Sequence, residues 1–572
     1  MKKLINKPED VVDEMLEGLL AIYPGLAKLS EHKVILRADA EDVRDTQVAL
    51  ISGGGSGHEP AHAGFVGAGM LNAAVAGEIF TSPPVEAVLA AVKAVSGSRG
   101  ALLIVKNYTG DRLNFGLAAE MARADGIPIE IVVVADDIAL AATHEPSGRR
   151  GIAGTVLVHK VAGAAAAEGM SLDAVANVAK SAADSIASMG ISLSAGTVPA
   201  VGKPSYDLGE SEVELGLGIH GEPGVRKGLL RKADEHVDEI VEAIIEAHSL
   251  HTRDRVALLI NNLGATTTME MTLVARRAVS ALETRKIAVD RVYAGTFMSS
   301  LDAAGISISV MRLNAERLRL LDAATFAPAW PPSSLERRRT LADRTIGSRS
   351  HRPVTGEQAR PADTEVNRTI EAACKAIIEA SNYLTELDRA VGDGDLGLNL
   401  ARGAMAVQEM LKTDSAENTP ETLRRVAETL QRVVGGSSGP FYGMLLLRAA
   451  NTLRTGKVQD PKLWAQACHE GCTAISEIGG AAAGDRTMLD ALIPFASTLT
   501  AGLQIGKPLS QVLTSAATAA EQGAQATAQM FPRRGRSSYL GERCLGHPDP
   551  GALAAAIWLR AVSNHIAGQS DT

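Results

Sequence analysis

The pattern of apolar residues changes once along this 572-residue chain, near Thr364. Before that point, short runs rich in β-branched residues, such as "VALIS" and "PIEIVVV", alternate with stretches of helical periodicity such as "PPVEAVLAAVKAV". This alternation predicts α/β structure, with a mostly parallel sheet covered by helices in the first part. Beyond Thr364, long Ala- and Leu-rich helical stretches follow one another with little strand signal, which predicts an all-α domain.

The boundaries of these parts are set where the alternation of strand-like and helical stretches restarts or stops. It restarts near Ser192, so we expect two α/β subdomains, at residues 1–191 and 192–332. Residues 333–363 are rich in Pro, Ser and Arg, which predicts an interdomain linker. The all-α domain then occupies residues 364–572.

Composition disfavours several classes of partner. The formal net charge of −9 argues against a nucleic-acid surface, which usually needs a basic face. No run of about 18 apolar residues is present, so no membrane span is expected. The first residues, "MKKLINKPED", lack the apolar segment of a signal peptide, and the four cysteines show no disulfide framework. We therefore expect a cytoplasmic protein.

Two loops of the first half place a histidine among glycines. "SGGGSGHEP" carries His58 and "GLGIHGEPG" carries His220, while "KNYTGD" brings Lys106 and Asp111 to the end of another strand-like run. Glycines let the backbone approach a ligand and leave the imidazole uncovered. A structural histidine in a tight turn is the alternative for each loop taken alone. Because the contexts match, we favour a site in which a neutral imidazole acts as base or nucleophile and Asp111 accepts a hydroxyl proton.

The loop "DRAVGDGDLGLNLARG" carries three carboxylates, Asp388, Asp393 and Asp395, within eight positions. Such anions repel one another unless a cation lies between them. Hard oxygen ligands suit Mg²⁺, which in enzymes usually accompanies phosphates. An acidic Gly-rich turn or a Ca²⁺ loop is the alternative, although the ligand spacing and closing Glu of an EF-hand are missing.

Three further Gly-rich loops precede helical segments: "GGSSGPFYG", "GGAAAGDRTMLDAL" and "GRSSYLGERCLGHPDPGA". A Gly- and Ser-rich turn that opens a helix offers free backbone N–H groups, which suit a phosphate. A simple helix end with a tight turn is equally compatible with any one of them. Together with the aspartate loop they favour a single nucleotide site at one end of the helical domain.

The whole chain resembles the single-chain, ATP-dependent dihydroxyacetone kinases. The resemblance rests on "SGGGSGHEPAHAGFVG", "KNYTGDRLNF", "GLGIHGEPG", "DGDLGLNL", "GGSSG", "GDRTMLDAL" and "GERCLGHPDPGA", which occur in the family's order. It implies a K domain of two α/β subdomains followed by an L domain, a barrel of helices. It also implies a homodimer in which the K domain of one subunit is served by the L domain of the other.

In the K domain, the resemblance implies that His220 binds the carbonyl carbon of a short ketose covalently, as a hemiaminal. Polyols such as glycerol, which lack a carbonyl, are thereby excluded. Asp111 would be the base on the terminal hydroxyl, and His58 would assist. The implied substrate-binding residues are Gly55, Ser56, Gly57, His58, Lys106 and Asp111.

In the L domain, the resemblance implies that Asp388, Asp393 and Asp395 hold two Mg²⁺ ions that bridge the phosphates of ATP. The implied nucleotide-binding residues are Asp393, Gly394, Asp395, Leu396, Ser437, Ser438, Gly479, Thr487, Met488, Asp549, Pro550 and Gly551. Leu396 stands where relatives often have a small or polar residue, which leaves the finer nucleotide contacts open.

The expected reaction is phosphorylation of dihydroxyacetone to dihydroxyacetone phosphate. Erythrulose is a rival substrate, because it exposes the same hydroxyketone end. Some relatives also split FAD into a cyclic flavin phosphate and AMP, using Mn²⁺. A non-enzymatic ketose-binding regulator is a third possibility, which the intact set of three aspartates disfavours because a sensor needs no metal–ATP site.

Overall fold

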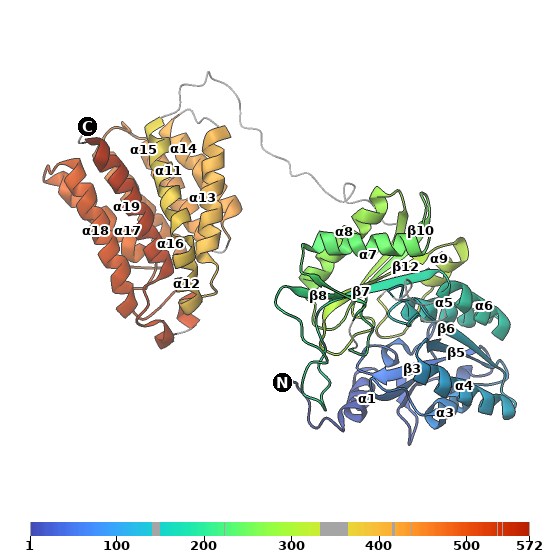
Figure 1. Ribbon diagram of the computed structural model, residues 1–572. Helices are drawn as coiled ribbons and strands as arrows, with labels where there is room; N and C mark the ends of the chain where they lie inside the picture. The colour runs from blue at the N-terminus through green and yellow to red at the C-terminus, as the bar shows by residue number, and fades with distance from the viewer. Residues whose placement is uncertain are drawn as a thin grey trace. The chain divides into compact units, whose positions relative to one another are not determined.

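The structure is a computed structural model, and it describes residues 2–139, 149–221, 224–331, 364–413, 418–435, 437–534, 536–539 and 541–570. The chain divides into two compact units, residues 1–348 and 349–572 (Figure 1). The predicted linker, residues 333–363, lies outside the described residues. The first unit is α/β and the second is helical, which confirms the predicted fold class.

The first sheet of the α/β unit has six strands in the order β1-β2-β4-β3-β5-β6. The strands are β1 (Leu26–Lys28), β2 (Val34–Arg37), β3 (Ala49–Ser56), β4 (Ala73–Ile79), β5 (Ala101–Lys106) and β6 (Ile129–Val134). β4, β3, β5 and β6 run parallel, whereas β1 and β2 join antiparallel. The strand ends that carry the Gly-rich loop and Lys106 therefore lie at the same edge of the sheet.

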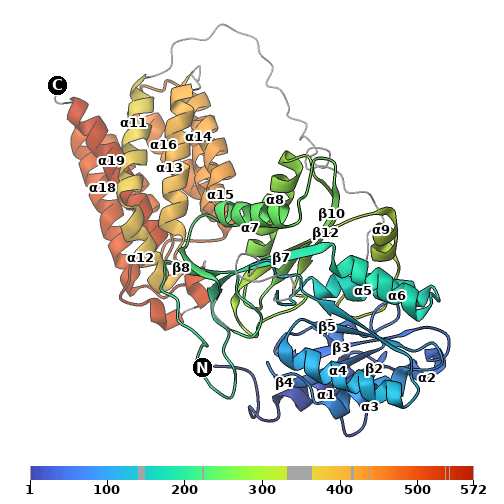
Figure 2. The same cartoon turned by 45° about the vertical axis from the view of Figure 1, so that its right-hand side comes forward.

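Helices cover both faces of this sheet (Figure 2). They are α1 (Val11–Ile22), α2 (Ala40–Val43), α3 (Val85–Val95), α4 (Thr109–Ala124), α5 (Thr155–Ala167) and α6 (Leu172–Ala183), with the short 3₁₀ helix η1 (Ala63–Phe65). Alternate residues of β5 point to opposite faces: Leu103 packs with α3 and α4, and Leu102 with α5 and α6. This explains why the strand is apolar throughout instead of alternating.

The second sheet has the order β11-β10-β12-β7-β8-β9. Its strands are β7 (Ile186–Ser194), β8 (Glu212–Leu215), β9 (Arg226–Leu229), β10 (Arg255–Asn262), β11 (Ala288–Gly295) and β12 (Ala304–Arg312), with helices α7 (Ala233–Ala247), α8 (Thr268–Thr284) and α9 (Ala315–Asp322). Only β10 and β11 pair in parallel, so this sheet is mostly antiparallel, which the sequence did not indicate. The physical reason is that periodicity reports burial of a strand and not its direction.

One continuous core joins the two sheets. α5 is buried on nearly every side, and its residues share a cluster with Leu102 of the first sheet and Leu259 and Met311 of the second. Its sequence is apolar on most sides, which suits an interior position, and the ammonium of its buried Lys160 donates to the carbonyl oxygen of Leu320. The predicted boundary between residues 191 and 192 lies inside β7, and all of β7 belongs to the second sheet. The proposed subdomain limits remain predictions.

In the described residues the second unit consists of helices. They are α11 (Thr364–Glu379), α12 (Ser381–Val391), α13 (Leu396–Thr413), α14 (Thr419–Val433), α15 (Ser438–Leu453), α16 (Pro461–Gly479), α17 (Leu489–Gln504), α18 (Leu509–Ala526) and α19 (Pro550–Ser570), with the 3₁₀ helices η3 (Thr527–Gln529), η4 (Arg536–Tyr539) and η5 (Gly541–Cys544). From α13 to α19 each long helix packs on the next, and α11 closes the ring between α19 and α13. The helices therefore form a barrel, around an apolar cavity of about 720 Å³.

Local sequence signals set several helix ends. The side chain of Asn418 accepts a hydrogen bond from the backbone N–H of Glu421 (3.0 Å) at the start of α14, and proline follows in the first turn. In the first unit, Thr267 and Glu270 form a capping box at the start of α8. Such caps satisfy N–H groups that a helix leaves unpaired.

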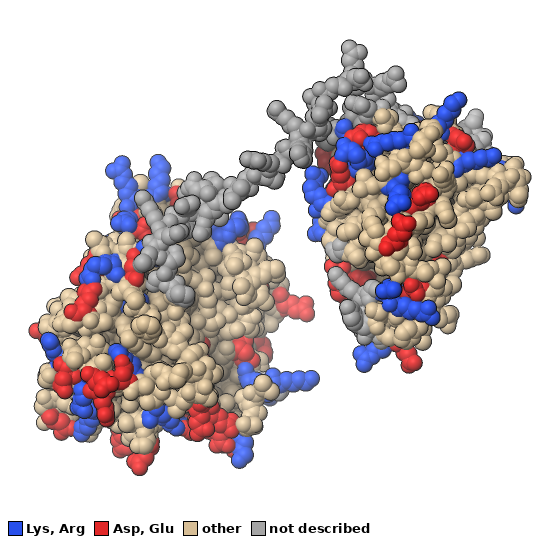
Figure 3. All heavy atoms as spheres, turned by 180° about the vertical axis from the view of Figure 1, so that it is seen from behind, with Lys and Arg blue, Asp and Glu red and all other residues tan. Residues whose placement is uncertain are grey.

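The surface of each unit mixes charges of both signs. Figure 3 shows acidic and basic side chains interspersed over the visible face of each unit, among uncharged residues. No helix in the described part of the chain is long and apolar enough to cross a lipid bilayer.

Replacing Leu103 with Ala should lower the free energy of unfolding of the first unit by about 2–5 kcal/mol, because its fully buried side chain leaves a cavity between β5 and α4. Leu117→Ala is the matched control: Leu117 lies on α4 and is 55% exposed, so its loss should cost less than about 0.5 kcal/mol. A urea titration followed by hydrogen-exchange mass spectrometry measures the unfolding of the first unit separately from that of the second. Equal costs for the two variants would contradict the assigned core.

Candidate functional site

The glycines at the end of β3 are required by neighbouring protein atoms. A Cβ on Gly53 would overlap the carbonyl oxygen of Val75 on β4, and one on Gly54 would overlap the ammonium nitrogen of Lys106. A Cβ on Gly55 would lie 2.6 Å from the backbone nitrogen of Thr81. The run "GGG" therefore lets β3 pass closely by the neighbouring chain and the Lys106 side chain.

The other two small residues predicted to bind substrate lie immediately beyond. Ser56 donates its hydroxyl to the carbonyl oxygen of Gly77 (2.7 Å), so this side chain ties β3 to β4. Gly57 has a φ of +98°, which L side chains rarely adopt, and its N–H donates to the carboxylate of Glu59 (3.0 Å). The glutamate of "SGGGSGHEP" therefore stabilises the turn that presents His58.

A buried ion pair lies at the ends of β5 and α4. Lys106 ends β5 with no exposed surface, and Asp111 lies in the first turn of α4 with 4% exposed. The Lys106 ammonium lies 3.4 Å from the Asp111 carboxylate, 3.0 Å from the carbonyl oxygen of Gly53 and 3.0 Å from Nε2 of His62. A buried charge of this kind persists only when its donors find acceptors.

His58 is fully buried and held in one tautomer. Its Nδ1 lies 2.9 Å from the carbonyl oxygen of Ser299, which can only accept, so Nδ1 carries the proton and Nε2 does not. No hydrogen-bond partner for Nε2 lies among the described residues. Burial, together with the charges of His220 and Lys106, holds the pKa of His58 well below its usual value. The imidazole is therefore neutral, with a lone pair available to a proton.

His220 lies next to His58, although 162 positions separate them in the sequence. The two rings meet edge to face, with centroids 4.9 Å apart. His220 also contacts the rings of Tyr108 (4.4 Å) and Phe80 (5.6 Å). Glu222 and Pro223 of the same loop lie outside the described residues. The structure thus brings together the two His–Gly loops that the sequence singled out.

An arginine clamp supports the segment that leads to His220. Arg150 donates to the carbonyl oxygen of Gly216 (2.6 Å) and pairs with Asp137 beyond the end of β6 (2.8 Å). Burial raises the pKa of Asp137 to about 6, and the charge of Arg150 opposes that rise. The clamp connects the end of the first sheet to the His220 segment.

Sequence reasoning missed three side chains of this site: His62, Phe80 and Tyr108. Tyr108 lies inside "KNYTGD" and His62 inside "HEPAH", so both belong to motifs that were recognised for other residues. Phe80 had no motif at all. Its ring contacts the rings of both His58 and His220, and only the folded structure shows this.

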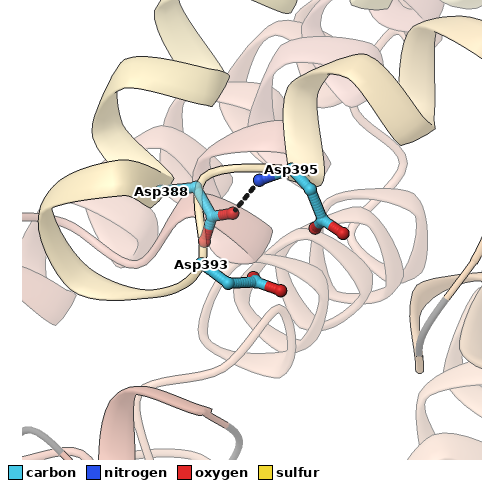
Figure 4. Close-up of side chains that lie close together, drawn as sticks. All are labelled: Asp388, Asp393 and Asp395. Carbon is cyan, nitrogen blue, oxygen red and sulfur yellow. Dashed lines mark hydrogen bonds between the residues drawn. The ribbon is translucent and has the colours of Figure 1, made fainter. Parts of the chain in front are cut away.

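The three aspartates of the helical unit converge as predicted (Figure 4). One carboxylate oxygen from each of Asp388, Asp393 and Asp395 lies within 4.8 Å of the others. Asp388, at the end of α12, is buried and accepts hydrogen bonds from the backbone N–H groups of Asp395 (3.0 Å) and Leu396 (3.1 Å). Gly394, with a φ of +75°, allows the tight turn between them. Three carboxylates at this spacing fit a hard divalent cation such as Mg²⁺.

The remaining predicted nucleotide residues lie at helix ends in two groups. Ser437 and Ser438 open α15, and a Cβ on Gly479, at the end of α16, would lie 2.8 Å from the ring of Phe441 in the first turns of α15. Thr487 and Met488 precede α17, while Asp549, Pro550 and Gly551 open α19. A Cβ on Gly551 would lie 4.0 Å from Cβ of Met488, so the starts of α17 and α19 lie side by side.

Asp549 already has a structural task at the start of α19. Its carboxylate accepts from the backbone N–H of Ala552 (2.8 Å), and burial raises its pKa to about 6 while the charge of Arg486 opposes the rise. Arg486, which sequence reasoning passed over within "GDRTMLDAL", is fully buried and donates to the carbonyl oxygen of His547 (2.9 Å). These bonds fix the loop before α19 against the loop before α17.

Comparison with known proteins covers both units. The Dak1 domain matches residues 17–329 and the DAK2 domain matches residues 390–564. The triokinase/FMN cyclase of Homo sapiens is 43% identical over 98% of both chains. The L-erythrulose kinase of Pectobacterium atrosepticum is 33% identical over 100% of this chain and 97% of its own. The dihydroxyacetone kinase of C. freundii, solved with AMP-PNP and Mg²⁺, is 34% identical with a TM-score of 0.64, covering 98% of this chain and 99% of that one.

Asp393→Asn should weaken the binding of Mn²⁺, an EPR-visible substitute for Mg²⁺, by at least about tenfold, because one anionic oxygen ligand is lost. Glu386→Gln is the control: it removes an exposed carboxylate of α12 that pairs with Arg389 and is not part of the aspartate cluster. EPR titration of free Mn²⁺ measures both affinities. Equal affinities of the Asp393 variant and the original chain would rule out the cluster as the metal site.

Proposed function

Because the chain belongs to the single-chain dihydroxyacetone kinase family of ATP-dependent kinases, we propose that it phosphorylates a short hydroxyketose, with dihydroxyacetone as the first candidate substrate. The observation that carries this proposal is the convergence of His58, His220 and the buried Lys106–Asp111 pair at one edge of the first sheet. Two imidazoles and a carboxylate beside the glycines of β3 suit a small carbonyl compound with a reactive hydroxyl.

We assign the covalent bond with the ketose to His220. A ring nitrogen donates its lone pair to the carbonyl carbon, the carbonyl oxygen gains a proton, and the other ring nitrogen loses one, which yields a neutral hemiaminal. The rings of Tyr108, Phe80 and His58 around His220 restrict its orientation, which supports this assignment. A substrate without a carbonyl cannot form the bond, so selection against polyols follows.

Asp111 is assigned as the base on the terminal hydroxyl, with His58 assisting. Asp111 is buried and has Lys106 as its cationic neighbour, so an ion pair orients it. The lone pair on Nε2 of the neutral His58 supports its assisting role. Gly55, Ser56, Gly57 and Lys106 remain proposed substrate-binding residues.

The aspartate cluster is assigned to two Mg²⁺ ions, which when bound neutralise the phosphate charge of ATP. Asp388 is locked by the backbone of its own loop, while Asp393 and Asp395 are exposed toward a ligand. The first turns of α15, α17 and α19 are proposed to contribute backbone N–H groups to the nucleotide. The family resemblance also supports a homodimer in which each K domain is served by the partner's L domain.

Two finer alternatives rest on the named relatives. The similarity to an L-erythrulose kinase supports a tetrulose as substrate. The similarity to a triokinase/FMN cyclase supports an additional lyase activity on FAD with Mn²⁺. Both keep the same two domains: a tetrulose differs from the first candidate in the pocket shape that it requires, and the lyase differs in its reaction and its metal.

An ADP-release assay with dihydroxyacetone, L-erythrulose and glycerol tests the proposal. We expect turnover with one or both hydroxyketones and none with glycerol, because glycerol has no carbonyl for His220. Asp388→Asn is the control variant, which should lose ATP turnover while the ketose still binds. A parallel incubation of FAD with Mn²⁺ reports the lyase. Failure to turn over any short hydroxyketone would refute the kinase proposal.

His220→Ala should raise the KM for the ketose by at least about tenfold and lower kcat by less, because the lost bond holds the substrate in ground state and transition state alike. His251→Ala, which changes an exposed histidine, is the control and should leave both constants unchanged. Steady-state kinetics at saturating ATP measures them. A fall in kcat with an unchanged KM would reassign His220 to proton transfer.

A further inference from the structure

His62 lies outside the predicted site and yet touches its central cation. It follows His58 by four positions, is 6% exposed, and places Nε2 at 3.0 Å from the Lys106 ammonium. Its other ring nitrogen, Nδ1, lies 3.5 Å from the hydroxyl oxygen of Ser52. The proposed reaction does not account for this contact.

The directions of these hydrogen bonds identify the tautomer. An ammonium group can only donate, so Nε2 of His62 must be the unprotonated nitrogen and Nδ1 must carry the proton. The Ser52 hydroxyl donates to the carbonyl oxygen of Ile104 (2.7 Å), which leaves its oxygen to accept from Nδ1. Donation therefore runs one way, from Lys106 through His62 and Ser52 to the backbone of β5.

His62 stays neutral in this environment, as an acceptor must. Burial is the largest cause that lowers its pKa well below the usual value, and the charge of Lys106 is the next. His159, whose ring centroid lies 5.1 Å away, and His58 lower it further. Protonation of His62 would also put two buried cations 3.0 Å apart.

The geometry of Lys106 shows what the contact accomplishes. An ammonium group has three protons, and Lys106 has three acceptors: the carbonyl oxygen of Gly53, Nε2 of His62 and the carboxylate of Asp111. Two of them, at 3.0 Å, fix the group in space; the third, at 3.4 Å, is the longest. The orientation of the proton that faces Asp111 thus depends on His62.

We propose that His62 is a positioning residue that, through its unprotonated Nε2, holds the Lys106 ammonium against Asp111 and so orients the base of phosphoryl transfer. The catalytic part of this inference rests on the proposed function of Asp111. The tautomer of His62 does not, because it follows from hydrogen-bond directions alone.

Two variants separate the acceptor from the bulk of the ring. His62→Leu fills the space without an acceptor, whereas the amide oxygen of His62→Gln can reach the position of Nε2. We expect kcat to fall at least about 30-fold in His62→Leu with the ketose KM within about threefold, and to recover to within about fivefold in His62→Gln. Equal losses in both variants would overturn the proposal, since a packing role does not depend on an acceptor.

His159→Phe is the matched control for a buried imidazole in the same cluster. No hydrogen bond of His159 ring nitrogens is found among the described residues, so its loss should change stability but leave kcat within about threefold. If His62→Leu does not fold, His62→Asn replaces it, because its shorter amide cannot reach Lys106. In a Lys106→Met background, the same His62 substitution should lower kcat by less than a further factor of about two. If it lowers kcat as much as it does in the original chain, action through Lys106 is contradicted.

Ring-¹⁵N histidine NMR of the full-length protein tests the tautomer without turnover. The His62 signals, assigned by their loss in His62→Gln, should show a neutral ring protonated on Nδ1 from pH 5.5 to 8, the range in which an ordinary histidine titrates. A proton on Nε2, or titration within that range, would overturn the proposal. Absence of turnover on every hydroxyketose together with the expected tautomer would instead refute the proposed function and leave the hydrogen-bond assignment intact.

Discussion

The charge of Lys106 is the constraint on which the α/β unit depends. An ammonium without exposed surface is tolerated only because every proton has an acceptor, and the acceptors come from three different places: the end of β3, the loop that follows it, and the first turn of α4. Satisfying that charge fixes the relative positions of β3, β5 and α4. Those elements present His58 and Asp111, so the geometry of the candidate site follows from the solvation of a single cation.

The same constraint explains the Gly-rich strand end. "SGGGSG" looks like a loop that cradles phosphate, yet Gly54 is required because the Lys106 ammonium occupies the space where its side chain would be. Gly55 is required by the backbone at Thr81. These glycines make room first for the protein's own cation and turn, and the proposed ketose would then contact backbone and imidazole. A triphosphate would require unpaired cations, and the three protons of Lys106 already have acceptors.

The sequence predicted the residues whose role depends on local position. The strand ends could be read from apolar runs, and with them came Lys106 and Asp111; the aspartate cluster could be read from the spacing of 388, 393 and 395. Contacts between segments that are far apart in the chain could not be predicted from the sequence. Arg150 reaches Gly216 over 66 positions, and β7 pairs antiparallel with β12, because neither strand direction nor loop path leaves a periodic signal. His62 was hidden for the same reason: its ring could be placed only once β3 and β5 were adjacent.

Charge also divides the chemistry between the two units. The proposed ketose site contains one cation that is already paired and histidines kept neutral by burial, so it has little capacity to balance four negative charges on ATP. The helical unit presents the opposite arrangement, with three carboxylates that are stable together only when a divalent cation joins them. The proposed function therefore assigns the phosphate charge to the unit where a metal can bind, and the activation of the reacting hydroxyl to the unit that presents a buried base. In the proposed function, a metal ion held by the acidic cluster would balance the charge of the nucleotide, while the buried lysine would orient the base and contact the substrate.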